Sequence, residues 1–148
     1  MEKKKVVAYI RVRKNEALSV HKEFFKKVFA NRDDSELVDI YWDAGVSGLK
    51  NNRSAFAKMI ADAEAGEFDY IVVKSLAKLS RDVDATIEII RKLKEHGVGI
   101  YSITERLDTL STKCEKYIEL MEATAELRKQ LTERERELAT LTEEKSEA

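Results

Sequence analysis

Residues 70–82, Tyr-Ile-Val-Val-Lys-Ser-Leu-Ala-Lys-Leu-Ser-Arg-Asp, contain the transition that decides the fold. The first four are β-formers, typical of a buried strand in a parallel sheet. The chain then becomes polar and supplies three cations and two hydroxyls: Lys74, Ser75, Lys78, Ser80 and Arg81. Open α/β sheets bind ligands at the carboxyl ends of their strands, and cations there favour an anion such as phosphate. A solvated turn is the alternative, since Lys and Arg are common on surfaces.

Strand and helix patterns alternate on both sides of this stretch. Further strands are predicted over 6–12, 37–42 and 98–103. Apolar residues at helical spacing predict helices over about 17–31, 53–66 and 83–97, and Gly66 and Gly97 are stop signals for the last two. The alternation predicts an α/β fold, with a mostly parallel open sheet of four to five strands and helices on both faces.

A single long helix is predicted from about residue 112 nearly to residue 148, because no breaker interrupts the stretch. Its apolar positions recur in heptads that Thr124 and Arg134 weaken. Such a helix cannot bury its stripe against the preceding domain alone, so a partner subunit is expected to cover it. We therefore predict a domain over 1–106, a linker and dimerisation helix over 107–148, and a dimer or tetramer held by the leucines of this stripe: Leu120, Leu127, Leu131 and Leu138.

Composition limits the function classes. The 148 residues carry 27 basic and 28 acidic side chains, so anion binding requires local clustering. One Cys and two His exclude an internal disulfide and a cysteine zinc site, and we expect no metal or other cofactor. No apolar run approaches the roughly 20 residues of a membrane span, so a cytoplasmic protein without membrane contact is expected.

In this topology the charged groups converge. Arg11 and Arg13 end the first strand two residues apart, and Arg53 opens the second helix, where a cation opposes the helix dipole. Asp43 and Ser47 follow the second strand, and the cationic loop follows the third. Surface solvation explains each residue singly but not their convergence, so a phosphate-type site is predicted at this rim. His21 is expected on an exposed helix face.

Several segments together resemble the catalytic domain of serine site-specific recombinases, the resolvase/invertase family. They are Tyr9-Ile10-Arg11-Val12, residues 43–48 with Arg53, and residues 74–82. Residues 105–109 and 125–136 resemble the family's passage into its long dimerisation helix. The resemblance implies a serine hydroxyl that attacks a DNA phosphodiester, with arginines that stabilise the transition state and no metal. It matches Arg11, Arg53 and Arg81 to active-site arginines, and Asp43 and Ser47 to the acidic and serine positions of the second motif.

Three positions depart from the family pattern. Arg13 occupies the nucleophile position, and a guanidinium has no nucleophilic atom at cellular pH. Lys78 replaces an arginine and loses its bidentate fork. Glu23 replaces a glutamine early in the first helix, which is expected to put a negative charge near the phosphate pocket. We therefore expect an inactive member, with Ser75 as the first candidate for a substitute nucleophile.

Three functions stay open at this point. The chain is a recombinase catalytic domain by descent, a non-catalytic dimerising partner of an active recombinase, or a small-anion enzyme on a similar scaffold. The resemblance implies DNA as a partner, although no DNA-binding domain is expected within the chain. From Glu133 onwards there are six Glu and three basic residues, a charge balance that would repel a phosphate backbone.

Overall fold

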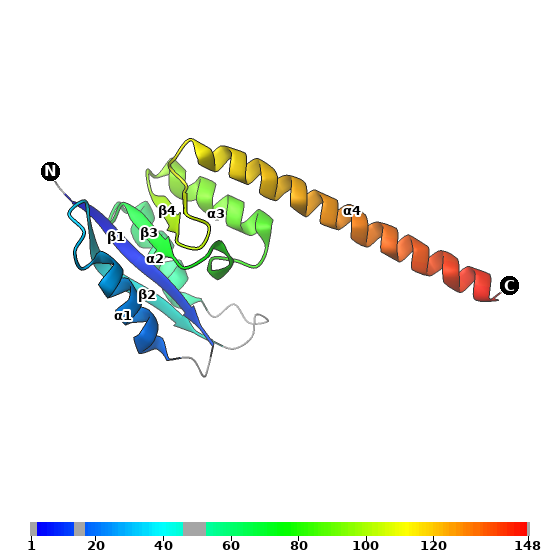
Figure 1. The fold of residues 1–148 in the computed structure, drawn as a ribbon, viewed down its shortest axis with the longest axis horizontal. Coiled ribbons are helices and arrows are strands. Elements are labelled where there is room, and N and C mark those ends of the chain that lie inside the picture. The colour runs from blue at the N-terminus through cyan, green and yellow to red at the C-terminus, as the bar shows by residue number, and fades with distance from the viewer. Residues whose placement is uncertain (1–2, 14–16, 46–52, 148) are drawn as a thin grey trace. The chain divides into compact units, whose positions relative to one another are not determined.

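The computed structural model describes residues 3–13, 17–45 and 53–147. The chain alternates strands and helices through most of its length (Figure 1). The strands are β1 (Lys4–Val12), β2 (Ser35–Ala44), β3 (Tyr70–Val73), β4 (Gly99–Ser102) and β5 (Leu107–Asp108). The helices are α1 (Leu18–Phe29), α2 (Ser54–Glu64), α3 (Val83–Glu95) and α4 (Lys113–Glu147), with a short 3-10 helix, η1, at Leu76–Lys78.

The five strands form one sheet in the order β2-β1-β3-β4-β5. All neighbouring pairs are parallel except β4 and β5, which are antiparallel. The predicted mostly parallel α/β sheet is therefore confirmed. The two-residue strand β5 is an addition that the sequence pattern did not locate.

Strand β1 lies inside the sheet and is buried on both faces, which explains its nearly continuous apolar run. Its even-numbered residues Val6, Ala8, Ile10 and Val12 form a core with Phe25 of α1 and Val72 of β3. On the other face, the ring of Tyr9 packs edge-on against Phe56 of α2, with ring centroids 5.3 Å apart. Helix α1 therefore covers one face, and α2 and α3, which contact each other, cover the opposite face (Figure 1).

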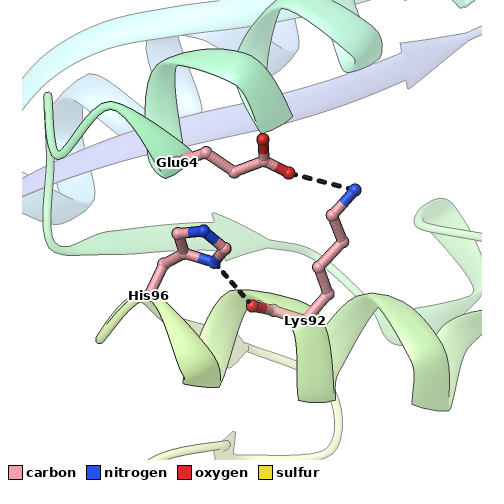
Figure 2. A network of polar contacts seen from close by, with 3 residues as sticks. All are labelled: Glu64, Lys92 and His96. Atoms are coloured by element: carbon pink, nitrogen blue, oxygen red, sulfur yellow. Dashed lines mark hydrogen bonds and ion pairs between the residues drawn. The ribbon is translucent and has the colours of Figure 1, made fainter.

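The helix ends follow the stop signals in the sequence. Gly66 and Gly97 have φ angles of +78° and +75°, the left-handed conformation in which glycine costs least. At the end of α3, the His96 ring Nδ1 donates to the Lys92 carbonyl over 3.0 Å, while Lys92 Nζ lies 3.0 Å from Glu64 Oε1 of α2 (Figure 2). This exposed pair links the two helices and is worth at most about 1 kcal/mol.

The chain divides into two compact units, residues 1–114 and 115–148. Strand β5 belongs to the first unit, since it pairs with β4. The division into functional domains at residue 106 stays a prediction.

Helix α4 supplies nearly all of the second unit and runs for 35 residues. The four leucines of its predicted stripe are each at least 60% exposed: Leu120, Leu127, Leu131 and Leu138. Along the described residues, no helix combines the length and apolar character that crossing a membrane requires.

Candidate anion-binding site at the carboxyl end of the sheet

Asp43 is a buried carboxylate at this end of the sheet, on the edge strand β2. It lies near the end of β2, directly opposite Arg11 of β1 in the strand register, and is only 7% exposed. Its Oδ1 accepts the backbone N–H of Ala55 at 3.0 Å, and its Oδ2 accepts that of Phe56 at 3.1 Å. The carboxylate thus satisfies two of the free N–H groups at the start of α2, where a negative charge is favoured.

Tyr9 completes the hydrogen bonding of this carboxylate. The Tyr9 hydroxyl donates to Asp43 Oδ2 over 2.7 Å from the face of β1 that α2 covers. Burial, and then the Asp43 bond, raise the pKa of Tyr9 to about 12, against a smaller opposing effect of Arg53. The phenol therefore stays protonated and remains a donor at neutral pH.

Arg53 joins three elements. It immediately precedes α2, and its Cζ lies 3.9 Å from the ring centroid of Phe56 and 5.5 Å from that of Tyr9. Its Nε and Nη2 each make a long 3.4 Å contact to the Tyr9 hydroxyl, and Nη2 also donates to the Lys78 carbonyl at 3.4 Å. The guanidinium is held mainly by the aromatic rings, which leaves much of its hydrogen-bonding capacity for a ligand.

A small pocket brings Arg11, Lys74 and Lys78 together with His21 of α1. Its volume is about 10 Å³, which is room for roughly one water molecule, so a larger anion would bind at its mouth. Lys74 Nζ lies 2.8 Å from His21 Nδ1 and 4.7 Å from the ring centroid of Phe24. Since an ammonium group only donates, Nδ1 accepts in this contact.

The loop that carries Lys74 and Lys78 is fixed by Thr104 and Glu105, which follow β4. The Lys74 carbonyl accepts both the N–H and the hydroxyl of Thr104, at 2.8 and 2.6 Å. Glu105 accepts the Leu76 N–H at 3.3 Å through Oε1 and the Ser102 hydroxyl through Oε2. These bonds set the cations at a defined place above the sheet edge.

The sequence matches the family described as "Resolvase, N terminal domain" over residues 6–147. The chain belongs to the resolvase family. The predicted family resemblance is thus confirmed, and the chain is a resolvase-family domain similar to serine recombinases and invertases.

Two proteins and two solved structures illustrate the similarity. This resolvase-family chain is 29% identical to DNA-invertase hin of Salmonella typhimurium over 93 residues, which cover 63% of this chain and 48% of the invertase. It is 25% identical to the DNA-invertase of Escherichia phage P1 over 126 residues, 85% of this chain and 63% of that protein. The chain therefore spans about half the length of the first of these relatives and under two thirds of the second.

The crystal structure of the N-terminal catalytic domain of TP901-1 integrase superposes with a TM-score of 0.72 at 29% identity, covering 86% of this chain and 98% of that one. A resolvase family site-specific recombinase from Streptococcus pneumoniae gives a TM-score of 0.64 at 21% identity, covering 93% and 97% of the two chains. This second likeness supports the fold alone.

The structure gathers only part of the predicted resolvase site. Arg11 and Lys78 share the small pocket, and Arg53 reaches the Lys78 carbonyl. Arg13 and Arg81 are exposed, and neither side chain makes an ion pair or hydrogen bond with another described residue. Ser75 is half-buried and directly precedes η1. Ser47 lies outside the described residues, so its predicted place in the site is not examined by the structure.

Two expectations about α1 were wrong. His21 is half-buried in the pocket rather than on an exposed face, because positions 21 and 25 both turn towards β1. Glu23 points away: its side chain is 62% exposed and lies 3.7 Å from Lys26 Nζ of the next turn. The structure therefore does not place its charge at the pocket. In the sequence, Tyr9 was singled out only as part of a motif. Its hydrogen bond to Asp43 could not be predicted without knowing which face of β1 is covered by α2.

Proposed function

We propose that this resolvase-family chain binds DNA phosphates at the carboxyl end of its sheet without cleaving the strand. The observation that carries the proposal is Arg13, which follows β1 where a serine recombinase is expected to place its nucleophilic hydroxyl. Support for phosphate binding comes from Arg11, Lys78 and Arg53, whose positive charges lie around one pocket and its neighbouring loop.

The chemistry explains why cleavage is not expected. Formation of a phosphoserine link needs an oxygen nucleophile in line with the leaving oxygen, and a guanidinium offers none. Lys78 also provides a single ammonium group where a guanidinium would contact two phosphate oxygens. Loss of one well-placed hydrogen-bond donor typically costs about 100-fold in rate. Arg13 and Lys78 therefore both lower the expected rate of DNA cleavage.

DNA is proposed as the partner because relatives of this chain carry names such as DNA-invertase hin and serine recombinase gin. We further propose a homo-oligomer of two or four copies, joined through the stripe formed by Leu120, Leu127, Leu131 and Leu138 of α4. We also propose the cytoplasm as its place of action, because the similar DNA-invertase hin and serine recombinase gin come from a bacterium and a phage, whose DNA lies in the bacterial cytoplasm.

The test is a search for covalent protein–DNA adducts. The unmodified chain is incubated with supercoiled plasmids carrying genomic fragments from its source, and DNA-linked protein is recovered after denaturation in detergent. We expect none from the unmodified chain or from Arg13→Ala, while an intact serine recombinase with its own site serves as the positive control. A DNA adduct at any serine of the unmodified chain would overturn the proposal. Peptide mapping would then identify the serine, with Ser75 examined first.

A gain-of-function variant makes the test sharper. Arg13→Ser with Lys78→Arg restores the hydroxyl and the guanidinium, and a DNA-binding domain fused after α4 supplies affinity. Glu23 needs no change because its side chain points away from the pocket. We expect adducts from this variant and none from the same fusion with Arg13 retained. Equal yields from the two fusions would show that residue 13 is not the nucleophile position.

A second candidate function is regulation of an active recombinase. The exposed leucine stripe of α4 favours it, since a subunit without a nucleophile could still pair with a competent one. Mixing the chain with an intact recombinase from the same source should then reduce recombination, and Leu127→Glu should relieve the inhibition.

A further inference from the structure

A groove lies on the α1 face of the sheet, away from the cationic pocket. Helix α1 packs on β1 and β2, and the groove continues past it over β3, β4 and β5. Lys4, Ser35 and Tyr70, which begin their respective strands, all line it. The groove therefore opens near the amino ends of the parallel strands, whereas the candidate phosphate site lies at their carboxyl ends.

The groove has the size and lining of a small-molecule site. Its volume is about 470 Å³, within the range of about 300–1,000 Å³ typical of ligand pockets. Val6 and Val72 line it from β1 and β3, Ile103 lines it from just after β4, and Phe29 and Tyr101 add aromatic rings from α1 and β4. Val6 and Val72 belong to the buried core at the bottom of the groove, and the partly buried Phe29, Tyr70 and Ile103 pack against that core and form its apolar walls.

One aromatic ring of the groove is rigidly placed. The Tyr70 hydroxyl donates to Asp108 Oδ2 over 3.2 Å, and its ring lies so close to Gly99 that a Cβ there would be 2.5 Å from it. Burial, and then the nearby Asp108 carboxylate, raise the pKa of Tyr70 to about 12. The ring is thus a fixed neutral surface at physiological pH, suited to stacking against a flat ligand.

The charged side chains around the groove differ in the hydrogen bonds that they already make. Asp108 already accepts the Tyr70 hydroxyl and the Leu110 N–H, and Asp34 Oδ1 accepts the Ser35 hydroxyl at 3.3 Å. Lys4 and Arg32, in contrast, form no side-chain hydrogen bond or ion pair with any described residue. Both cations lie over aromatic rings of the groove. Lys4 Nζ is 5.2 Å from the Tyr70 ring centroid, and Arg32 Cζ is 5.7 Å from that of Phe29.

We propose that this groove binds a small molecule that combines a flat aromatic body with one anionic group. The body fills the apolar floor and stacks on Tyr70, while the anion takes the unused donors of Lys4 and Arg32 at the rim. Asp34 and Asp108 already accept hydrogen bonds within the protein, whereas the side chains of Lys4 and Arg32 have no hydrogen-bonding partner among the described residues, so the rim favours an anionic over a cationic ligand. The site is independent of the proposed DNA function.

The test uses a matched pair of fluorescent probes. One is 8-anilinonaphthalene-1-sulfonate, and the other is N-phenyl-1-naphthylamine, which has the same ring system without the sulfonate. We expect the sulfonate to bind the unmodified chain at least about tenfold more tightly than the neutral probe, a difference of about 1.4 kcal/mol. Equal affinities would overturn the assignment of an anionic ligand.

Three variants locate the binding. Lys4→Gln with Arg32→Gln should weaken sulfonate binding about tenfold and leave the neutral probe within about twofold. Val28→Trp, which fills the groove from α1, should abolish binding of both probes. Glu126→Gln on α4 should affect neither. Amide NMR shifts on adding the sulfonate should include Lys4, Phe29 and Tyr101. Loss of binding in Glu126→Gln, or shifts confined to α4, would refute the site, and circular dichroism of each variant verifies that it is folded.

Discussion

Removal of the Asp43 carboxylate should destabilise the first unit more than any other single change at the candidate site. The carboxylate accepts three hydrogen bonds, from the N–H groups of Ala55 and Phe56 and from the Tyr9 hydroxyl. In Asp43→Ala, the start of α2 loses its acceptor, and the buried Tyr9 hydroxyl loses its carboxylate partner.

The magnitude follows from these contacts. Loss of a side-chain acceptor at a helix start costs about 1 kcal/mol, and a buried donor left unsatisfied costs about 1–3 kcal/mol. The two effects share one carboxylate and are not strictly additive, so we expect a loss of about 3 kcal/mol in the free energy of unfolding. Asp43→Asn retains one carbonyl acceptor and should lose about half as much.

Trp42 provides the assay, because it is the single tryptophan and neighbours Asp43 on β2. Urea unfolding followed by Trp42 fluorescence reports the first unit without a contribution from α4. Asp39→Ala is the matched control: Asp39 is exposed on the same strand, and the one hydrogen bond of its carboxylate among the described residues is accepted from the N–H of Ile40. The control should change stability by no more than about 0.5 kcal/mol. An Asp43→Ala variant that unfolds like the control would refute the role assigned to this carboxylate.

Three further predictions concern Tyr9, Lys78 and α4. The pKa of Tyr9 lies above its ordinary value of 10.0, at about 12, so the neutral phenol stabilises the folded state fully below pH 10 and the stabilisation is lost as the pH rises through 12. Tyr9→Phe should therefore make the urea midpoint less sensitive to pH between these two values. Lys78→Glu should weaken binding of a fluorescent DNA duplex about tenfold at low salt, whereas Lys58→Glu on the exposed side of α2 should change it less than about twofold, and equal effects would contradict the site. Leu127→Glu should shift the chain towards monomer in sedimentation experiments while Glu126→Gln does not, and a monomeric unmodified chain at tens of micromolar would count against the α4 interface.

Most helices and strands could be predicted because apolar residues recur in them at the spacing typical of a helix or a strand. The run at Tyr70–Val73 is a strand with those bounds, and Gly66 and Gly97 terminate helices with the positive φ that such glycines permit. Strand β5 has only two residues, too few to show any period, and its pairing depends on β4 being beside it. It therefore could not be located from local pattern.

The site was predicted less completely, because its geometry depends on side-chain direction. Arg11 and Asp43 were expected at the ends of strands, and the register places them opposite each other on β1 and β2. Which residues of α1 face the sheet depends on the phase of the helix, and an error of two positions exchanged the roles of His21 and Glu23. The buried role of Tyr9 required the pairing of β1 with α2, which no single segment encodes.

The network that holds the site is separate from the position where the nucleophile is expected. Tyr9 bonds to both Asp43 and Arg53. Asp43 also bonds to the start of α2, and Arg53 to the Lys78 carbonyl, and none of these contacts uses residue 13. Arg13 is exposed, so exchange with serine in either direction should change stability by no more than about 0.5 kcal/mol. Folding of the domain and placement of the surrounding cations therefore do not depend on which residue stands at position 13. An Arg13→Ser variant that is folded yet inactive would locate the remaining defect in the charges, Lys78 first, or in DNA affinity.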